Sequence, residues 1–212
     1  MILINMLDVW SYITELIEDD SDKCHLMMTC EWISGCLFYF NQMNIYEKIL
    51  RSRWFDHFTN ILVEKKINFK RKFPYSIIHL TFGDKFNKSV KKCIPSTVLY
   101  LKFGDHFNHP ITDSIPSSIT HLIFGTYFNR AINGLIPSSI KYLEFGFGFS
   151  KSIKNNIPSS VTHLLLGACY NNSKLKGCIP SSVTHLTIDP RFEHFNYEDI
   201  PPTVTHLYEI NY

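Results

Sequence analysis

Apolar and polar positions repeat with a fixed spacing along residues 74–210 of this chain. A proline recurs every 21 or 22 residues, at 74, 95, 116, 137, 158, 180 and 201. Counting from each proline, position three is β-branched, position six is leucine, and position eight is apolar in every copy but the last, which has Glu209. Positions five and seven between them are polar or variable. This alternation predicts one short β-strand in each repeat.

The rest of each repeat has a regular pattern too. Glycine at position nine follows five of the predicted strands, an aromatic residue stands at position twelve, and an aliphatic residue precedes most prolines. Glycine allows the chain to leave the strand in a turn, and the residue before proline is held extended. The stretch between this aromatic residue and the aliphatic residue before the next proline, called the return segment, is long enough only for a turn or a brief 3₁₀ segment. Because one repeat cannot bury its own apolar positions, stacked repeats must share a core.

The sequence therefore predicts a repeat solenoid with a parallel β-sheet of leucine-rich-repeat type. It has about seven strands beginning near Pro74, and residues 61–63 are a candidate extra strand before them. The last strand, residues 205–210, has no following cap in the sequence and could pair with a second copy.

Residues 7–40 show a different pattern, with apolar residues at helical spacing followed by the acidic run 18–22. Side-chain oxygens in that run can cap a second helix that begins near Cys24. We expect a small α-helical domain at residues 1–50, a linker with the candidate capping strand at 51–73, and the repeats at 74–212.

Residues 115–132, IPSSITHLIFGTYFNRAI, resemble the FNIP repeat, a relative of the leucine-rich repeat that is abundant in slime moulds and in giant viruses of amoebae. The resemblance covers residues 74 to about 210. Phe149-Ser150 departs from it by lacking the asparagine, and the segment after Asp189-Pro190 lacks both the glycine and the Phe-Asn pair. The resemblance implies a solenoid that binds other proteins.

The N-terminal segment resembles an F-box, the helical module that docks a substrate receptor onto the linker subunit of a cullin-type ubiquitin ligase. Asp8 stands where that family has a proline. The resemblance implies contacts with the linker subunit through Leu7, Leu26, Met27, Cys30 and Trp32. Alternatively, these residues pack a helical cap over the first coil, because an open solenoid end exposes its core.

Positions five and seven should share the face of the sheet opposite the leucines. Position five is always histidine or tyrosine, which raises the hypothesis of a metal site or a proton relay. Metal ligands converge from several directions, whereas the residues of such a row all point the same way. We therefore expect these rings to stack along the sheet, and we expect neither a metal nor another cofactor.

Position seven varies while its neighbours stay constant, as expected for a surface with individual contacts to a partner. Together with two tyrosines of position five, its side chains form a mixture typical of protein-binding surfaces. The candidate contact residues on this face are Thr81, Tyr100, Lys102, Ile123, Tyr142, Glu144, Leu165, Thr187 and Tyr208.

Composition narrows the function further. A formal net charge of +2 gives no reason to expect nucleic acid. Because acidic residues interrupt the apolar N-terminus, we expect it to be neither a secretion signal nor a membrane span. We expect a cytoplasmic protein, in the host cytoplasm if the source is viral, with its six cysteines as free thiols. The sequence contains no GxSxG, Walker or HExxH motif, which argues against an enzyme.

Two hypotheses remain for the function. In the first, the chain is a substrate-recognition adaptor that docks to a ubiquitin-ligase scaffold and holds a target on the sheet face. In the second, it is a free-standing binding protein whose helical segment only caps the solenoid.

Overall fold

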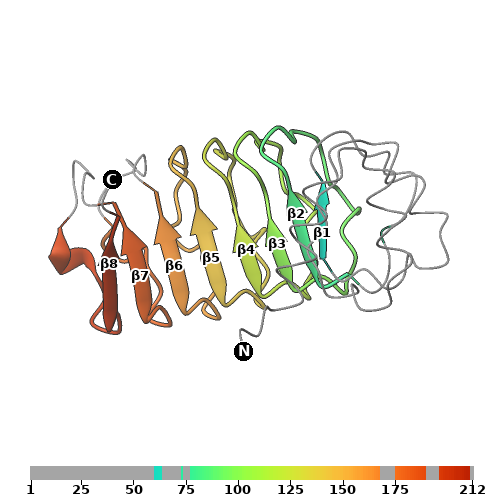
Figure 1. The fold of residues 1–212 in the computed structure, drawn as a ribbon. Helices are drawn as coiled ribbons and strands as arrows, with labels where there is room; N and C mark the ends of the chain where they lie inside the picture. Colours follow the sequence, from blue (N-terminus) through green and yellow to red (C-terminus); the bar gives the residue numbers. More distant parts are fainter. Residues whose placement is uncertain (1–59, 64–72, 74–76, 168–174, 190–195, 211–212) are drawn as a thin grey trace, which may run out of the picture.

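The computed structural model describes residues 60–63, 73, 77–167, 175–189 and 196–210. These residues form one parallel sheet of eight strands that follow one another in chain order (Figure 1). The strands are β1 (Asn60–Val63), β2 (His79–Phe82), β3 (Tyr100–Lys102), β4 (His121–Ile123), β5 (Tyr142–Phe145), β6 (His163–Leu166), β7 (His185–Ile188) and β8 (His206–Glu209), and the 3₁₀ turn η3 (Tyr197–Asp199) precedes β8.

The register of the sheet follows the repeat without a slip. Leu80 of β2 lies beside Leu101 of β3, and every later strand places its position-six leucine next to the previous one. β1 pairs with β2 in the same parallel manner, so the extra strand expected at residues 61–63 is confirmed. Because side chains alternate across a strand, this register lines up equivalent residues in straight rows.

Buried side chains fill the space between the sheet and the return segments. The position-six leucines of β2–β7 are at most 2% exposed, and the β-branched residues of position three are fully buried in the same coils. Burying a side chain of this size contributes about 1.5–3 kcal/mol. Val204 and Leu207 of the last coil are only partly buried, since no described coil covers them.

Two stacks of phenylalanine form the centre of the core. Position-eight rings of neighbouring coils lie 5.3–5.5 Å apart, and position-twelve rings lie 6.1–6.3 Å apart. Within a coil the two rings are 3.9–4.4 Å apart. All eight rings are at most 1% exposed. The rings are Phe82, Phe86, Phe103, Phe107, Phe124, Phe128, Phe145 and Phe149.

The glycine column at position nine has a different cause from the one expected. A Cβ atom on Gly104 would lie 2.4 Å from the carbonyl carbon and oxygen of Gly83, and a Cβ atom on Gly125 would lie 2.4 Å from the Gly104 oxygen. These glycines do not have a positive φ. Glycine is needed here because successive backbones approach too closely for any side chain, and not because the turn requires its flexibility.

The left-handed backbone occurs elsewhere, three residues before the proline. Gly134 and Gly177 have φ of 63° and 71° there, and Lys92, Asp113 and Asn155 adopt φ of 52–59° at the equivalent place. This conformation lets each return segment reverse direction in a few residues. For the three residues with a Cβ atom, it carries a steric cost.

The asparagine that follows the position-twelve phenylalanine links one coil to the next. The backbone N–H of Asn108 donates to Oδ1 of Asn87 at 3.1 Å, and that of Asn129 donates to Oδ1 of Asn108 at 3.0 Å. Ser150 continues the ladder, because its N–H donates to Oδ1 of Asn129 at 3.1 Å. The Ser150 hydroxyl also contacts the Asn129 side chain, so the coil without asparagine is still linked to its predecessor.

Serines at position two form a parallel ladder. The hydroxyls of Ser118, Ser139 and Ser160 donate to a backbone carbonyl of the preceding coil at 2.6–2.8 Å. These three serines therefore satisfy backbone carbonyls of the coil before them. In the next two coils the ladder stops, because the buried hydroxyls of Ser182 and Thr203 have no hydrogen-bond partner.

Several expectations concern residues outside those described. They include the helical domain at 1–50 and the domain boundary near residue 50. Among the described residues, no helix has both the length and the apolar character needed to cross a membrane.

Candidate protein-binding face

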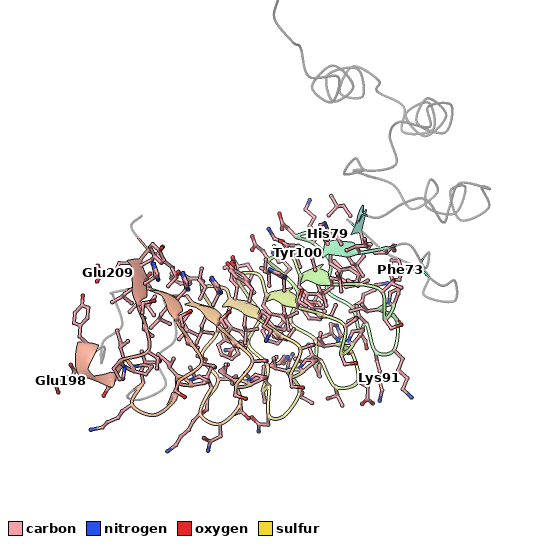
Figure 2. The ribbon with its side chains drawn as sticks, turned by 90° about the horizontal axis from the view of Figure 1, so that it is seen from below. Phe73, His79, Lys91, Tyr100, Glu198 and Glu209 are labelled. Atoms are coloured by element: carbon pink, nitrogen blue, oxygen red, sulfur yellow. The ribbon has the colours of Figure 1, made fainter. Side chains whose placement is uncertain are left out.

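Positions five and seven lie on the outer surface of the sheet. In β5, β6 and β7 the side chains of these positions are half-buried, whereas positions six and eight are buried. Figure 2 shows His79 and Tyr100 on the sheet side of the coils, and Lys91 among the return segments on the opposite side. We call this outer surface the sheet face. The prediction that both positions share it is confirmed.

Position five forms a continuous row of seven rings along the sheet face. From His79 to His163, neighbouring ring centroids are 5.4–6.3 Å apart and most pairs are tilted. The last three imidazoles are closer and nearly parallel: His163 and His185 are 4.1 Å apart, and His185 and His206 are 4.2 Å apart. The row therefore ends in a compact stack of imidazoles on β6–β8.

Four histidines of this row contact the threonine directly before them. The distance between Oγ1 and Nδ1 is 2.9–3.0 Å in each case. The four pairs are Thr120–His121, Thr162–His163, Thr184–His185 and Thr205–His206. Each contact fixes the orientation of the imidazole ring.

Position seven runs beside the ring row and combines different side chains. Lys102 is exposed and Tyr208 is 53% exposed, whereas Ile123 and Leu165 are half-buried. Glu144 accepts a hydrogen bond of 2.8 Å from the Tyr142 hydroxyl, which belongs to the ring row. The remaining members are Thr81 and Thr187, both half-buried.

The Tyr142–Glu144 hydrogen bond links the two rows of the sheet face. Burial, together with this bond, raises the pKa of Tyr142 well above its ordinary value. The phenol therefore stays protonated and keeps donating to the carboxylate. Burial raises the pKa of Tyr100 as well, helped by the charge of Glu144.

The structure adds apolar residues to this region that sequence reasoning missed. Ile78 and Leu99, at position four, are 39% and 43% exposed, and the Leu99 N–H donates to the Ile78 carbonyl at 2.8 Å. Beyond the other ends of the strands, Tyr127 and Phe147 are 57% and 42% exposed. The sequence signal was the occurrence of isoleucine and leucine at a position that is elsewhere threonine or lysine.

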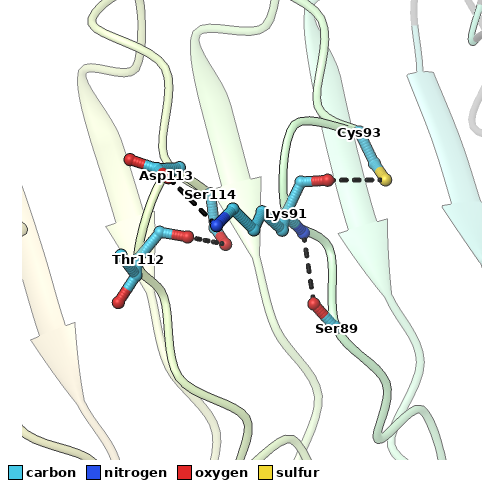
Figure 3. Close-up of polar contacts among 6 residues, drawn as sticks. All are labelled: Ser89, Lys91, Cys93, Thr112, Asp113 and Ser114. Atoms are coloured by element: carbon cyan, nitrogen blue, oxygen red, sulfur yellow. Dashed lines mark hydrogen bonds and ion pairs between the residues drawn. The ribbon is translucent and has the colours of Figure 1, made fainter.

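The return segments opposite the sheet have a different surface. Lys91 and Asp113, on neighbouring coils, form an exposed ion pair of 3.2 Å, and the hydroxyl of Ser114 donates to the Thr112 carbonyl (Figure 3). Exposed pairs of this kind contribute about 0–1 kcal/mol. This side is thus held together by backbone turns and scattered polar contacts.

The described residues contain no group of three or more histidine, cysteine or acidic side chains that could hold a metal ion. Among them, neither Cys93 nor Cys178 forms a disulfide. Burial raises the pKa of both, which lowers the fraction of reactive thiolate. The F-box-like candidates Leu7, Leu26, Met27, Cys30 and Trp32 lie outside the described residues, and their role stays a prediction.

The sequence matches the family model described as "FNIP Repeat" in three consecutive segments, residues 68–106, 107–148 and 149–189. Together they cover more than half of the chain. The chain belongs to the FNIP-repeat family. The asparagine ladder and the phenylalanine stacks described above are therefore built from FNIP repeats.

Comparison with solved structures supports the same assignment. A structure described as "The crystal structure of CroV588 a novel circular LRR protein structure" is similar to this chain, with a TM-score of 0.63 and 34% sequence identity. The match covers 72% of this chain but only 24% of the other, so this chain spans about a quarter of that protein. No curated protein matches the sequence at a significant level. The FNIP repeats thus form a parallel solenoid of leucine-rich-repeat type, a fold associated with protein–protein interaction.

Proposed function

We propose that this FNIP-repeat chain is a scaffold that holds a protein target on its sheet face. The observation that carries the proposal is the pairing of a constant ring row with a column whose chemistry changes from coil to coil. The column presents cationic, anionic, apolar and aromatic side chains at Lys102, Glu144, Leu165 and Tyr208. The parallel register holds them about 4.8 Å apart from strand to strand.

The rigidity of the face supports binding. Its side chains project from strands that are hydrogen-bonded on both sides from β2 to β7, so little backbone order has to be gained when a partner docks. Aromatic side chains such as Tyr100 and Tyr208 can provide contact area at a small entropic cost. The exposed Ile78 and Leu99 extend the apolar part of this surface.

A catalytic role is less well supported. The Thr120–His121 contact places a hydroxyl beside an imidazole, which is one requirement of nucleophilic catalysis. However, the backbone N–H groups of both residues already donate to the Leu99 carbonyl, at 2.8 and 3.1 Å. Neither is available to stabilise an oxyanion next to that hydroxyl.

Site-specific photocrosslinking tests the binding proposal. A photoreactive phenylalanine analogue replaces Ile123 or Leu165 on the sheet face, and Asn133 or Lys154 on the return segments as matched controls. We expect a discrete protein adduct in cells from the two face positions and none from the controls. Equal adducts from both sides, or adducts from the controls alone, would count against the sheet face as the binding surface.

The finer proposal is that the chain is a cytoplasmic adaptor for a cullin-type ubiquitin ligase. It rests on the F-box resemblance of the N-terminal segment and on a solenoid that can hold a target. The test is co-purification of the full chain with the linker subunit. We expect Leu26→Ala with Trp32→Ala to abolish that complex while the circular dichroism of the repeats stays unchanged. No complex at micromolar concentration leaves the alternative, a free-standing binding protein.

A further inference from the structure

The strongest unassigned feature of the molecule is the imidazole stack on β6–β8, formed by His163, His185 and His206. Its centroid distances of 4.1 and 4.2 Å are much shorter than those elsewhere in the ring row. Each of the three imidazoles has its Nδ1 atom against a threonine hydroxyl. In an imidazole held through Nδ1, Nε2 is the nitrogen left for another partner.

The hydrogen bonds of the backbone indicate which atom accepts the hydrogen bond of the threonine hydroxyl. The Thr184 hydroxyl lies 3.4 Å from the Thr162 carbonyl oxygen, and that oxygen already accepts N–H bonds of 3.0 Å from Thr184 and from His185. The distance from the hydroxyl to Nδ1 of His185 is shorter, at 3.0 Å. Because both lone pairs of that carbonyl are already engaged, it is the weaker acceptor, and beside a neutral imidazole the hydroxyl donates mainly to Nδ1.

The pairs Thr162–His163 and Thr205–His206 have the same arrangement. Their hydroxyls are 2.9 Å from Nδ1 and 3.3 Å from a carbonyl that already accepts two N–H bonds. When Nδ1 accepts a hydrogen bond from the threonine hydroxyl, a neutral imidazole carries its own hydrogen on Nε2. The stack therefore presents three Nε2–H donors in a row.

The threonine hydroxyl also fits the protonated imidazole. An imidazolium has a hydrogen on Nδ1 and donates it to the threonine oxygen, and the hydroxyl then turns toward the carbonyl at 3.3–3.4 Å. Each imidazole can thus gain a proton without leaving a donor or acceptor unpaired. Such a site can receive a negative charge from a partner.

We propose that the imidazole stack of His163, His185 and His206 is a binding site for a carboxylate-bearing, acidic segment of the protein target. The Nε2–H groups donate to the carboxylates, and an imidazole takes up a proton as the complex forms. The threonines before the histidines act as positioning residues. This inference rests on the proposed protein-binding function and specifies which chemistry that face recognises.

The charges around the stack are compatible with an acidic partner. β6 and β7 contain no charged side chain besides their histidines. On β5, Glu144 is hydrogen-bonded to Tyr142, and Lys141, directly before that strand, is exposed. On the other side, Glu209 of β8 accepts a hydrogen bond of 2.5 Å from Tyr197, and Tyr208 carries no charge. Both neighbouring carboxylates are therefore engaged by tyrosine hydroxyls.

The proton balance sets the sign of the pH dependence. Burial and the two adjacent imidazoles lower the pKa of His185 below its ordinary value of about 6.5, so it is neutral in the free protein at neutral pH. A bound carboxylate favours the imidazolium and raises that pKa. Binding is therefore stronger at pH 6 than at pH 8.

Nuclear magnetic resonance of the full chain tests the hydrogen-bond assignment without a partner. At pH 8, ¹⁵N shifts should show the Nε2–H tautomer for His163, His185 and His206. In Thr184→Val, His185 should lose this preference while the other two keep it. An Nδ1–H tautomer in the unsubstituted protein would overturn the proposed row of donors.

Binding is tested with a fluorescein-labelled hexaglutamate peptide and the uncharged hexaglutamine peptide as its control. We expect hexaglutamate to bind about tenfold more tightly at pH 6 than at pH 8, the ratio expected when a charge-assisted hydrogen bond replaces a neutral one. His185→Gln and Thr184→Val should each remove most of that ratio, and hexaglutamine should not bind.

Three outcomes overturn the proposal. The first is equal affinity at both pH values, and the second is binding that His185→Gln leaves unchanged. The third is tighter binding of a single-stranded oligonucleotide through the same histidines, which would point to another class of partner. If photocrosslinking from Ile123 or Leu165 persists in His185→Gln at both pH values, the imidazole stack is rejected as the site. The proposal that the sheet face binds a protein is then retained.

Discussion

Replacing Gly125 with alanine tests the close stacking of the coils most directly. The added Cβ atom would lie 2.4 Å from the Gly104 oxygen, whereas ordinary van der Waals contacts begin at 3.4 Å. The two coils must therefore separate locally by about 1 Å, since the obstacle is backbone that cannot rotate away.

The cost of this separation follows from the hydrogen bonds that join the two coils. The Phe103 N–H donates to the Ile123 carbonyl at 2.8 Å, on one side of the glycine. On the other side, the Tyr127 N–H donates to the Asp105 carbonyl at the same distance. An extra 1 Å disrupts both bonds, at about 1 kcal/mol each, and loosens the stacked phenylalanines by a further 1–2 kcal/mol. We expect a loss of about 3–4 kcal/mol.

Gly134→Ala is the matched control. A Cβ atom on Gly134 meets nothing within 4 Å, but φ is +63°, so the substitution introduces backbone strain without a clash. We expect this variant to lose only about 1 kcal/mol. Urea unfolding followed by far-ultraviolet circular dichroism measures both variants. If Gly125→Ala is no less stable than Gly134→Ala, close backbone approach does not explain the glycine column.

Three further predictions concern the asparagine ladder, the left-handed backbone position and the imidazoles. Asn108→Ala should lower the free energy of unfolding by about 1–2 kcal/mol, because the Asn129 N–H loses its acceptor; an unchanged thermal midpoint would contradict this. Lys92→Gly should raise stability by up to about 1 kcal/mol in urea unfolding, because it relieves a positive φ of 55°, and a lower midpoint would refute that cause. The pKa values of His121 and His185 are lowered by burial and by other imidazoles of the ring row, so below pH 6.5 the unfolded chain binds more protons. The free energy of unfolding should be highest above pH 6.5 and should decline toward pH 5, as the pH approaches the lowered pKa values of the folded protein. A variant with glutamine at both sites should show a shallower decline of its thermal midpoint.

The strands could be predicted from sequence because each depends on a local pattern repeated at constant spacing. Leucine at position six and an apolar residue at position eight determine which face of each strand is buried. Constant spacing then fixes the parallel register, since a slip of one residue would expose every leucine. β1 could be anticipated although no family proline precedes it, because residues 61–63 are apolar and β-prone.

Contacts between coils were harder to predict. A glycine at position nine is visible in the sequence, but whether it serves a turn or a close approach depends on its distance to the equivalent glycine of the preceding coil, such as Gly83 for Gly104. The left-handed position was hidden because Lys92, Asp113 and Asn155 share it with two glycines. Residue type alone does not reveal a backbone angle that the stacked coils impose.

In the candidate site, too, features set by the local sequence pattern could be predicted, whereas features set by contacts between coils could not. The variable column at position seven followed from strand alternation alone. The threonine–histidine pairs were missed because they depend on how a hydroxyl lies against the preceding coil. A sequence signal did exist: threonine precedes four of the histidines in the row, whereas Tyr100 and Tyr142 follow leucine and lysine.

The asparagine ladder has a direction, and this affects how the solenoid can form. Oδ1 of Asn87 and of Asn108 each accept an N–H from the coil that comes later in the chain. A finished coil therefore offers ready acceptors to the next 21 residues, and adding that coil closes only a short loop. Growth of the solenoid toward the C-terminus resembles elongation of a polymer from an existing end. A defect in one coil would stall the coils that follow it and leave the earlier ones intact.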